Sequence, residues 1–153
     1  MYYGIKSLID VRADAMPSDY PEYDREHLYQ HCEQHKIVYH WAGRQLGNSI
    51  NGSKRSHHCA LDDVILRSYA DYMTSHKFQI AATQIINMAQ QGTIAIFSQN
   101  ALPLIDFRFL LADYLLLQGI QIIHILAVDE LRDHLLHKNA RRESTELIYD
   151  NLD

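Results

Sequence analysis

The chain has 153 residues, of which 47% are hydrophobic and 22% are charged, and its formal net charge is −5. This composition is typical of one globular domain, and the negative charge argues against an extended nucleic-acid-binding surface. Its two cysteines provide no disulfide framework, and the chain opens without a secretory leader or an apolar run of the ~18 residues that a membrane helix needs. We therefore expect a cytoplasmic protein with a single domain over residues 1–153.

The first part of the chain reads as strand, loop, helix and strand. Leu8–Arg12 and Ile37–Trp41 are short apolar runs typical of buried strands. Prolines interrupt residues 13–23, which predicts a loop, and Asp24 is a suitable N-cap for a helix over residues 25–36. This alternation of strand and helix indicates an α/β protein.

A stretch rich in glycine, serine and asparagine follows over residues 43–56 and predicts a flexible loop. Hydrophobic residues then recur at helical spacing before and after a more apolar central segment, residues 93–126. This spacing predicts helices from a cap at Asp62 or Asp63 to Met73, over His76–Gln90 with an end at Gly92, over Asp129–Lys138, and over Arg141–Tyr149.

The central segment predicts a βαβ unit. Thr93–Phe97 and Ile120–Leu126 are apolar runs rich in strand formers, and a helix that ends at Gly119 lies between them. Ser98, Gln99 and Asn100 then follow the first strand, at the edge where parallel sheets bind their ligands. We expect an α/β three-layer sandwich, with a mostly parallel sheet of about four strands and helices on both faces.

Several short motifs together resemble one known family. In chain order they are LIDVR from Leu8, YPEYDREHL from Tyr20, HWAGR from His40, RSYADYMTSHKF from Arg67, HIL from His124, and His134. Their order is similar to that in the bacterial family catalogued as domain of unknown function 488. The resemblance covers residues 8–134.

The departures from this family are informative. Its members carry Cys-x-Glu at a strand end and Cys-His-Arg at the start of the next helix. The resemblance places these motifs on Ser98 and Asn100, and on Asp106, Phe107 and Arg108, so that only the arginine remains. Family members also have a strand and a helix ahead of the LIDVR motif. The resemblance thus implies a degenerate member that has either lost this unit or been assigned the wrong start codon.

Polar residues at the strand ends predict a corner that accepts an anion. Arg108 falls in the first turn of a predicted helix, where backbone N–H groups favour anions. Alternatively, Arg108 pairs with Asp10 or another carboxylate and only orients the corner. The predicted ligand-binding residues are Asp10, Arg12, Arg44, Ser98, Asn100 and Arg108.

Catalytic chemistry has two candidate residues. Ser98 as a nucleophile needs a histidine base, but His124 lies in an apolar run and no Gly-x-Ser-x-Gly elbow surrounds the serine. Asp106 is the alternative, as an acid or base beside Arg108, which would stabilise negative charge.

Histidines form two groups in the sequence without a recognisable metal site. His27, His31 and His35 recur at helical spacing, and His57 and His58 precede Cys59. Neither group offers the four ligands of a structural zinc site. We therefore expect a solvated polar face for the first group, and no metal and no cofactor.

The helix that contains Ile105, Phe109, Ala112 and Leu116 is apolar on nearly every side, which favours full burial or cover by a second subunit. A homodimer or a partner protein is therefore expected. The function that we predict is non-catalytic binding of a small anion (phosphate, nucleotide or carboxylate) or of a protein partner. The alternative is a hydrolase- or transferase-type enzyme in which Asp106 and Arg108 replace the family's cysteines.

Overall fold

The computed structural model describes residues 3–13, 20–47 and 55–151. Its elements, in chain order, are β1 (Ser7–Asp10), η1 (Pro21–Tyr23), α1 (Arg25–Gln34), β2 (Val38–Trp41), α2 (Gly43–Leu46), α3 (Val64–Tyr72), α4 (His76–Gln91), β3 (Ile94–Phe97), η2 (Pro103–Ile105), α5 (Arg108–Leu117), β4 (Ile123–Ala127), β5 (Glu130–Asp133), β6 (Ala140–Glu143) and β7 (Glu146–Tyr149).

The main sheet contains three parallel strands in the order β2-β1-β3. Ile9 of β1 lies opposite His40 of β2 and Ile96 of β3, and its side chain is buried. The parallel pairing predicted from the alternation of strands and helices is confirmed. Because β3 ends at Phe97, the polar turn that begins at Ser98 lies at the carboxyl edge of the sheet, as expected.

The prediction of about four strands in this sheet is not confirmed, because the described residues contribute three strands to it. β4 forms an antiparallel pair with β5 instead of joining β3, so the segment from 93 to 126 is not a βαβ unit of one sheet. Within the residues that the structure describes, the protein thus has a mixed α/β fold with one parallel sheet and two antiparallel hairpins, and the three-layer sandwich is not confirmed. A consequence is that β3 is an edge strand within the described part of the chain.

The two helices predicted near the C-terminus are also wrong. Residues 129–138 contain strand β5, and residues 141–149 form most of the β6–β7 hairpin. Leu147 and Tyr149 are buried while their neighbours are more exposed, which is the period of two of a strand. Ser144 adopts a positive φ of 56° in the tight turn between the two strands.

The remaining helices agree with the sequence. α3 begins after Asp63, whose side chain accepts hydrogen bonds from the N–H groups of Ile65 and Leu66 at 2.7 and 3.0 Å. Gly119 follows α5 with a φ of 84°, the left-handed conformation of a C-terminal glycine. The loop expected over residues 43–56 begins with α2, and its residues 48–54 lie outside the described residues.

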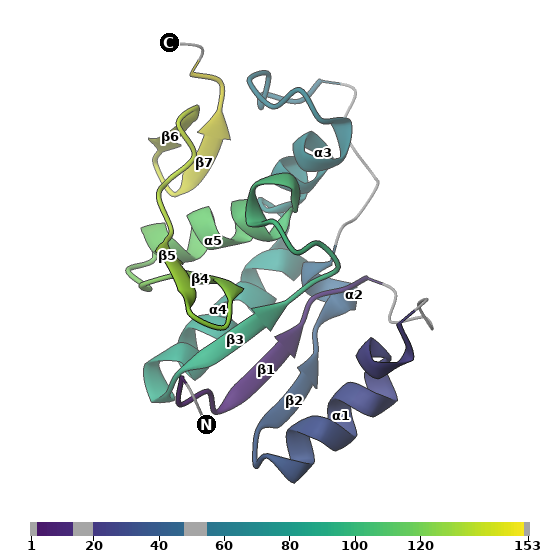
Figure 1. The fold of residues 1–153 in the computed structure, drawn as a ribbon. Coiled ribbons are helices and arrows are strands. Elements are labelled where there is room, and N and C mark those ends of the chain that lie inside the picture. The colour runs from purple at the N-terminus through teal and green to yellow at the C-terminus, as the bar shows by residue number, and fades with distance from the viewer. Residues whose placement is uncertain (1–2, 14–19, 48–54, 152–153) are drawn as a thin grey trace.

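One apolar core joins the sheet to helices α2 to α5, which gather on one side of it, whereas α1 lies beside β2 (Figure 1). Tyr69, Phe78 and Tyr114 form its aromatic centre, with the Phe78 ring edge-on to both tyrosine rings. Over the described ranges, no helix is long and apolar enough to cross a bilayer.

Candidate functional site

Asp10 and Arg12, at the end of β1, form a buried ion pair. Arg12 Nη2 lies 2.7 Å from Asp10 Oδ2, Arg12 Nε lies 2.9 Å from Oδ1, and the hydroxyl of Tyr39 donates to Oδ2 at 2.6 Å. The hydrogen bonds to Asp10 raise the pKa of Arg12 despite its burial. Charge and hydrogen-bonding capacity are therefore matched inside the protein, and this geometry supports a structural role for both residues.

Arg44 lies at the same edge and packs on a tryptophan. Its guanidinium carbon is 5.5 Å from the centre of the Trp41 ring, and that of Arg25 is 4.5 Å from the same ring. Trp41 Nε1 donates to the carbonyl oxygen of Arg12 at 2.9 Å. Arg44 is exposed beside this corner rather than enclosed in a pocket.

Asp106 organises the turn that follows β3. Its Oδ2 accepts hydrogen bonds from Ser98 Oγ at 2.6 Å and from Asn100 Nδ2 at 2.9 Å, and its Oδ1 accepts from the backbone N–H of Arg108 at 2.8 Å. The structure thus brings together four of the five residues onto which the resemblance places the family's motifs, all except Phe107. Asp106 is only 2% exposed, and its buried hydrogen bonds connect the end of β3 to the start of α5.

The side chain of Arg108 lines a cavity. Its Nη2 donates to the carbonyl oxygen of Asn100 at 2.9 Å. Burial lowers the pKa of Arg108, and the nearby charge of Asp106 partly offsets this effect. The side chain of Arg108 thus binds the carbonyl oxygen of Asn100, and its backbone N–H binds Asp106. The alternative interpretation named Asp10 or another carboxylate, and the carboxylate beside Arg108 is that of Asp106.

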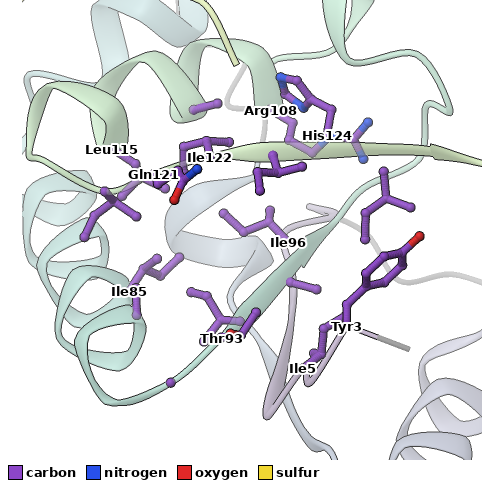
Figure 2. A pocket seen from close by; sticks show the side chains of 18 of the residues that line it. Tyr3, Ile5, Ile85, Thr93, Ile96, Arg108, Leu115, Gln121, Ile122 and His124 are labelled. Atoms are coloured by element: carbon purple, nitrogen blue, oxygen red, sulfur yellow. The ribbon is translucent and has the colours of Figure 1, made fainter. Parts of the chain in front are cut away.

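The cavity has a volume of about 760 Å³ and lies among β3, β4, α4 and α5. Figure 2 shows Arg108 and His124 together at one part of its wall, away from Ile85 and Thr93. The rest of the wall is mainly aliphatic, including Ile85, Ile94, Ile96, Leu115, Ile120, Ile122, Ile123, Ile125 and Leu131. This combination suits a ligand with an apolar body and one polar or anionic group.

His124 is hydrogen-bonded to a buried network of polar side chains. His124 Nε2 lies 2.8 Å from His134 Nδ1, and His134 Nε2 lies 2.8 Å from Asp113 Oδ1. The other oxygen of Asp113 accepts from the hydroxyl of Tyr149 at 3.0 Å. The hydrogen bond with Asp113 favours a proton on His134 Nε2, so that His134 Nδ1 accepts from His124.

This arrangement keeps His124 neutral. Burial, followed by the nearness of His134 and Arg108, lowers the pKa of His124 to about 4. The exposed wall of the cavity therefore offers one permanent positive charge, on Arg108, and one neutral imidazole. Sequence reasoning placed His124 in the core and missed Asp113, although a carboxylate within the apolar helix Arg108–Leu117 was a signal that it needed buried partners.

The predicted site residues therefore fall into three places. Ser98, Asn100 and Arg108 gather at Asp106, Asp10 and Arg12 pair with each other, and Arg44 packs on Trp41. His27, His31 and His35 are exposed on and just after α1. Within the described residues, no three histidine, cysteine or acidic side chains group closely enough to hold a metal ion.

Comparison with known proteins identifies a family. The family model described as "Domain of unknown function DUF488" matches residues 2–115, which is well over half of the chain. Comparison with curated proteins and with solved structures finds no match. The extent of the family match shows that the chain belongs to the DUF488 family.

Proposed function

We propose that this protein binds a small anionic ligand, specifically a carboxylate with an apolar body, in the cavity between β3 and β4. The observation that carries the proposal is the position of Arg108, whose partly desolvated guanidinium lines a cavity with mainly aliphatic walls. A charge in such surroundings gains more from an anionic partner than a charge in water does.

Competing positions for the anion are less favourable. The charge of Arg12 is neutralised by Asp10 at 2.7 Å, and Arg44 is exposed on the surface of Trp41. Ser98 and Asn100 both donate to Asp106, so we assign them to the support of Arg108 rather than to the ligand itself. Of the residues predicted to bind an anion, only Arg108 is therefore proposed to contact the ligand.

Binding is favoured over the hydrolase- or transferase-type reaction. An acid or base must reach a proton on the substrate, whereas the oxygens of Asp106 accept hydrogen bonds from Ser98, Asn100 and Arg108, and the residue is buried. The hydroxyl of Ser98 donates to that same carboxylate, and no histidine contact of Ser98 supports a nucleophilic role among the described residues.

Thermal-shift and calorimetric titrations with hexanoate, hexanol and inorganic phosphate test the proposal. Hexanoate should stabilise the wild type, and hexanol and phosphate should have much weaker effects because each lacks one half of the recognised chemistry. Arg108→Ala should weaken hexanoate binding by about 30-fold, since a hydrogen-bonded charge contributes roughly 2 kcal/mol.

Arg44→Ala is the matched control, because it removes the same charge at the same edge of the sheet but outside the cavity. Retention of hexanoate binding in this variant is the expected result. Equal losses in the two variants, or no binding of hexanoate by the wild type, would refute the proposal.

A further inference from the structure

The cavity is bounded by the edges of two strands that do not pair with each other. Consecutive residues of β3 line it, namely Ile94, Ala95 and Ile96, and so do Ile123, His124 and Ile125 of β4 with Ile122 just before that strand. Successive side chains of a strand point to opposite faces, so a space that is lined by consecutive residues lies along the edge of the strand. The space is therefore flanked by two strand edges.

The free backbone groups of β3 are directed toward this space. Val11 N–H donates to the carbonyl oxygen of Phe97 at 2.9 Å, which directs the backbone groups of Phe97 and Ala95 toward β1. Because alternate residues of a strand direct these groups to opposite edges, those of Ile94 and Ile96 face the cavity side. Within the described chain, β3 has no strand partner on that side.

The same alternation applies to β4. His134 N–H donates to the carbonyl oxygen of Ile122 at 2.9 Å, so the backbone groups of Ile122 and His124 face β5. Those of Ile123 and Ile125 then point to the opposite edge, and both residues line the cavity. Two rows of backbone donors and acceptors thus border one apolar space.

We propose that this space accepts an extended polypeptide strand, which pairs with β3 and β4 and joins the sheet to the β4–β5 hairpin. The inference rests on the proposed function, because it identifies the anionic ligand as a carboxylate carried by a peptide. Strand addition to open edges is a recurring mode of peptide recognition, in which backbone hydrogen bonds provide affinity and side-chain pockets provide specificity.

The lining of the cavity specifies the chemistry of that strand. Its middle must be aliphatic, because Ile96 of β3 and Ile122 next to β4 line the space between the two strands. Its acidic residue must lie near Arg108, the positive charge on the wall, where His124 is neutral and adds no second charge. An extended, weakly acidic segment in which apolar and polar residues alternate fits the space better than a basic or a helical segment.

A short synthetic peptide of alternating valine and threonine tests this inference, prepared in two forms with one aspartate at either terminus. We expect one form to bind and to slow the hydrogen exchange of the amides of Ile96 and Ile123 at least tenfold, with no change at Cys32 on α1. A peptide that is N-methylated at alternate positions, which cannot pair along one edge, is the matched control and should bind at least tenfold more weakly.

The outcomes separate the two proposals. Binding of hexanoate without binding of either peptide, or equal binding of the N-methylated peptide, would overturn strand insertion and leave the carboxylate site in place. Peptide binding that depends on backbone N–H groups but is unchanged in Arg108→Ala would support strand insertion and refute the role of Arg108. Binding that is lost in Arg108→Ala, retained in Arg44→Ala and sensitive to N-methylation would support both.

Discussion

The ion pair at the end of β1 allows a quantitative test of whether its residues are structural. In Asp10→Asn, the guanidinium of Arg12 loses its charged partner while its side chain remains only 5% exposed. Removal of one member of a buried ion pair costs about 3–5 kcal/mol, because the remaining charge is uncompensated. We therefore expect a loss of about 4 kcal/mol, a large part of the roughly 5–15 kcal/mol by which a typical domain is stable.

Urea unfolding followed by circular dichroism measures this loss. The double variant Asp10→Asn/Arg12→Met removes the orphaned charge and keeps an acceptor for the hydroxyl of Tyr39. It should recover most of the stability, to within about 1–2 kcal/mol of the wild type, since apolar replacements of buried ion pairs are often close to neutral.

A loss below about 1 kcal/mol in Asp10→Asn would contradict this account, because only solvent-exposed ion pairs contribute so little. That result would mean that Arg12 is accessible and available to a ligand, as the sequence suggested. The double variant should also bind hexanoate like the wild type, because neither substitution touches the cavity.

Three further predictions concern other parts of the molecule. The pKa of His124 is about 4 in the folded protein and about 6.5 in an unfolded chain, so the unfolded state binds the proton first as the pH falls. The free energy of unfolding should therefore drop by about 2 kcal/mol from pH 6.5 to pH 4, after allowance for solvent screening. A urea midpoint that does not change with pH would contradict this. Ser98→Ala should cost about 1–2 kcal/mol in urea unfolding, since Asp106 loses a buried hydrogen-bond donor; an unchanged midpoint would show that the hydroxyl is dispensable. Ellman's reagent should modify the exposed Cys59 rapidly and the buried Cys32, whose thiol pKa is raised by burial, only after unfolding; two equally fast thiols would disagree with the fold.

The elements with strong local patterns were predictable from the sequence. Helix α3 was located by a cap predicted at Asp62 or Asp63, which the structure places at Asp63, and the strands β1 and β3 by their short apolar runs. The C-terminal hairpins were not located, because the leucines of residues 129–138 recur at helical spacing although Leu135 is 77% exposed in the structure. The alternation of Leu147 with Tyr149 did carry the strand signal, and charged neighbours obscured it.

The pairing partner of β4 could not be predicted from the hydrophobic pattern of the sequence. Its apolar run correctly indicated a strand, but hydrophobic periodicity does not say which edge a strand joins. The same limit applies to the site. The sequence placed Ser98, Asn100 and Arg108 near one another, yet the partnership of Asp10 with Arg12 and the depth of Asp113 depend on tertiary packing.

Trp41 gives this protein an internal optical reporter. It is the chain's single tryptophan, and its indole is fixed by a hydrogen bond to the carbonyl oxygen of Arg12 and by two guanidinium groups near its ring. Its emission consequently records the integrity of the carboxyl edge of β1 and β2. Fluorescence and far-ultraviolet dichroism will follow one transition if this edge and the helices unfold together, and two transitions if the edge opens first.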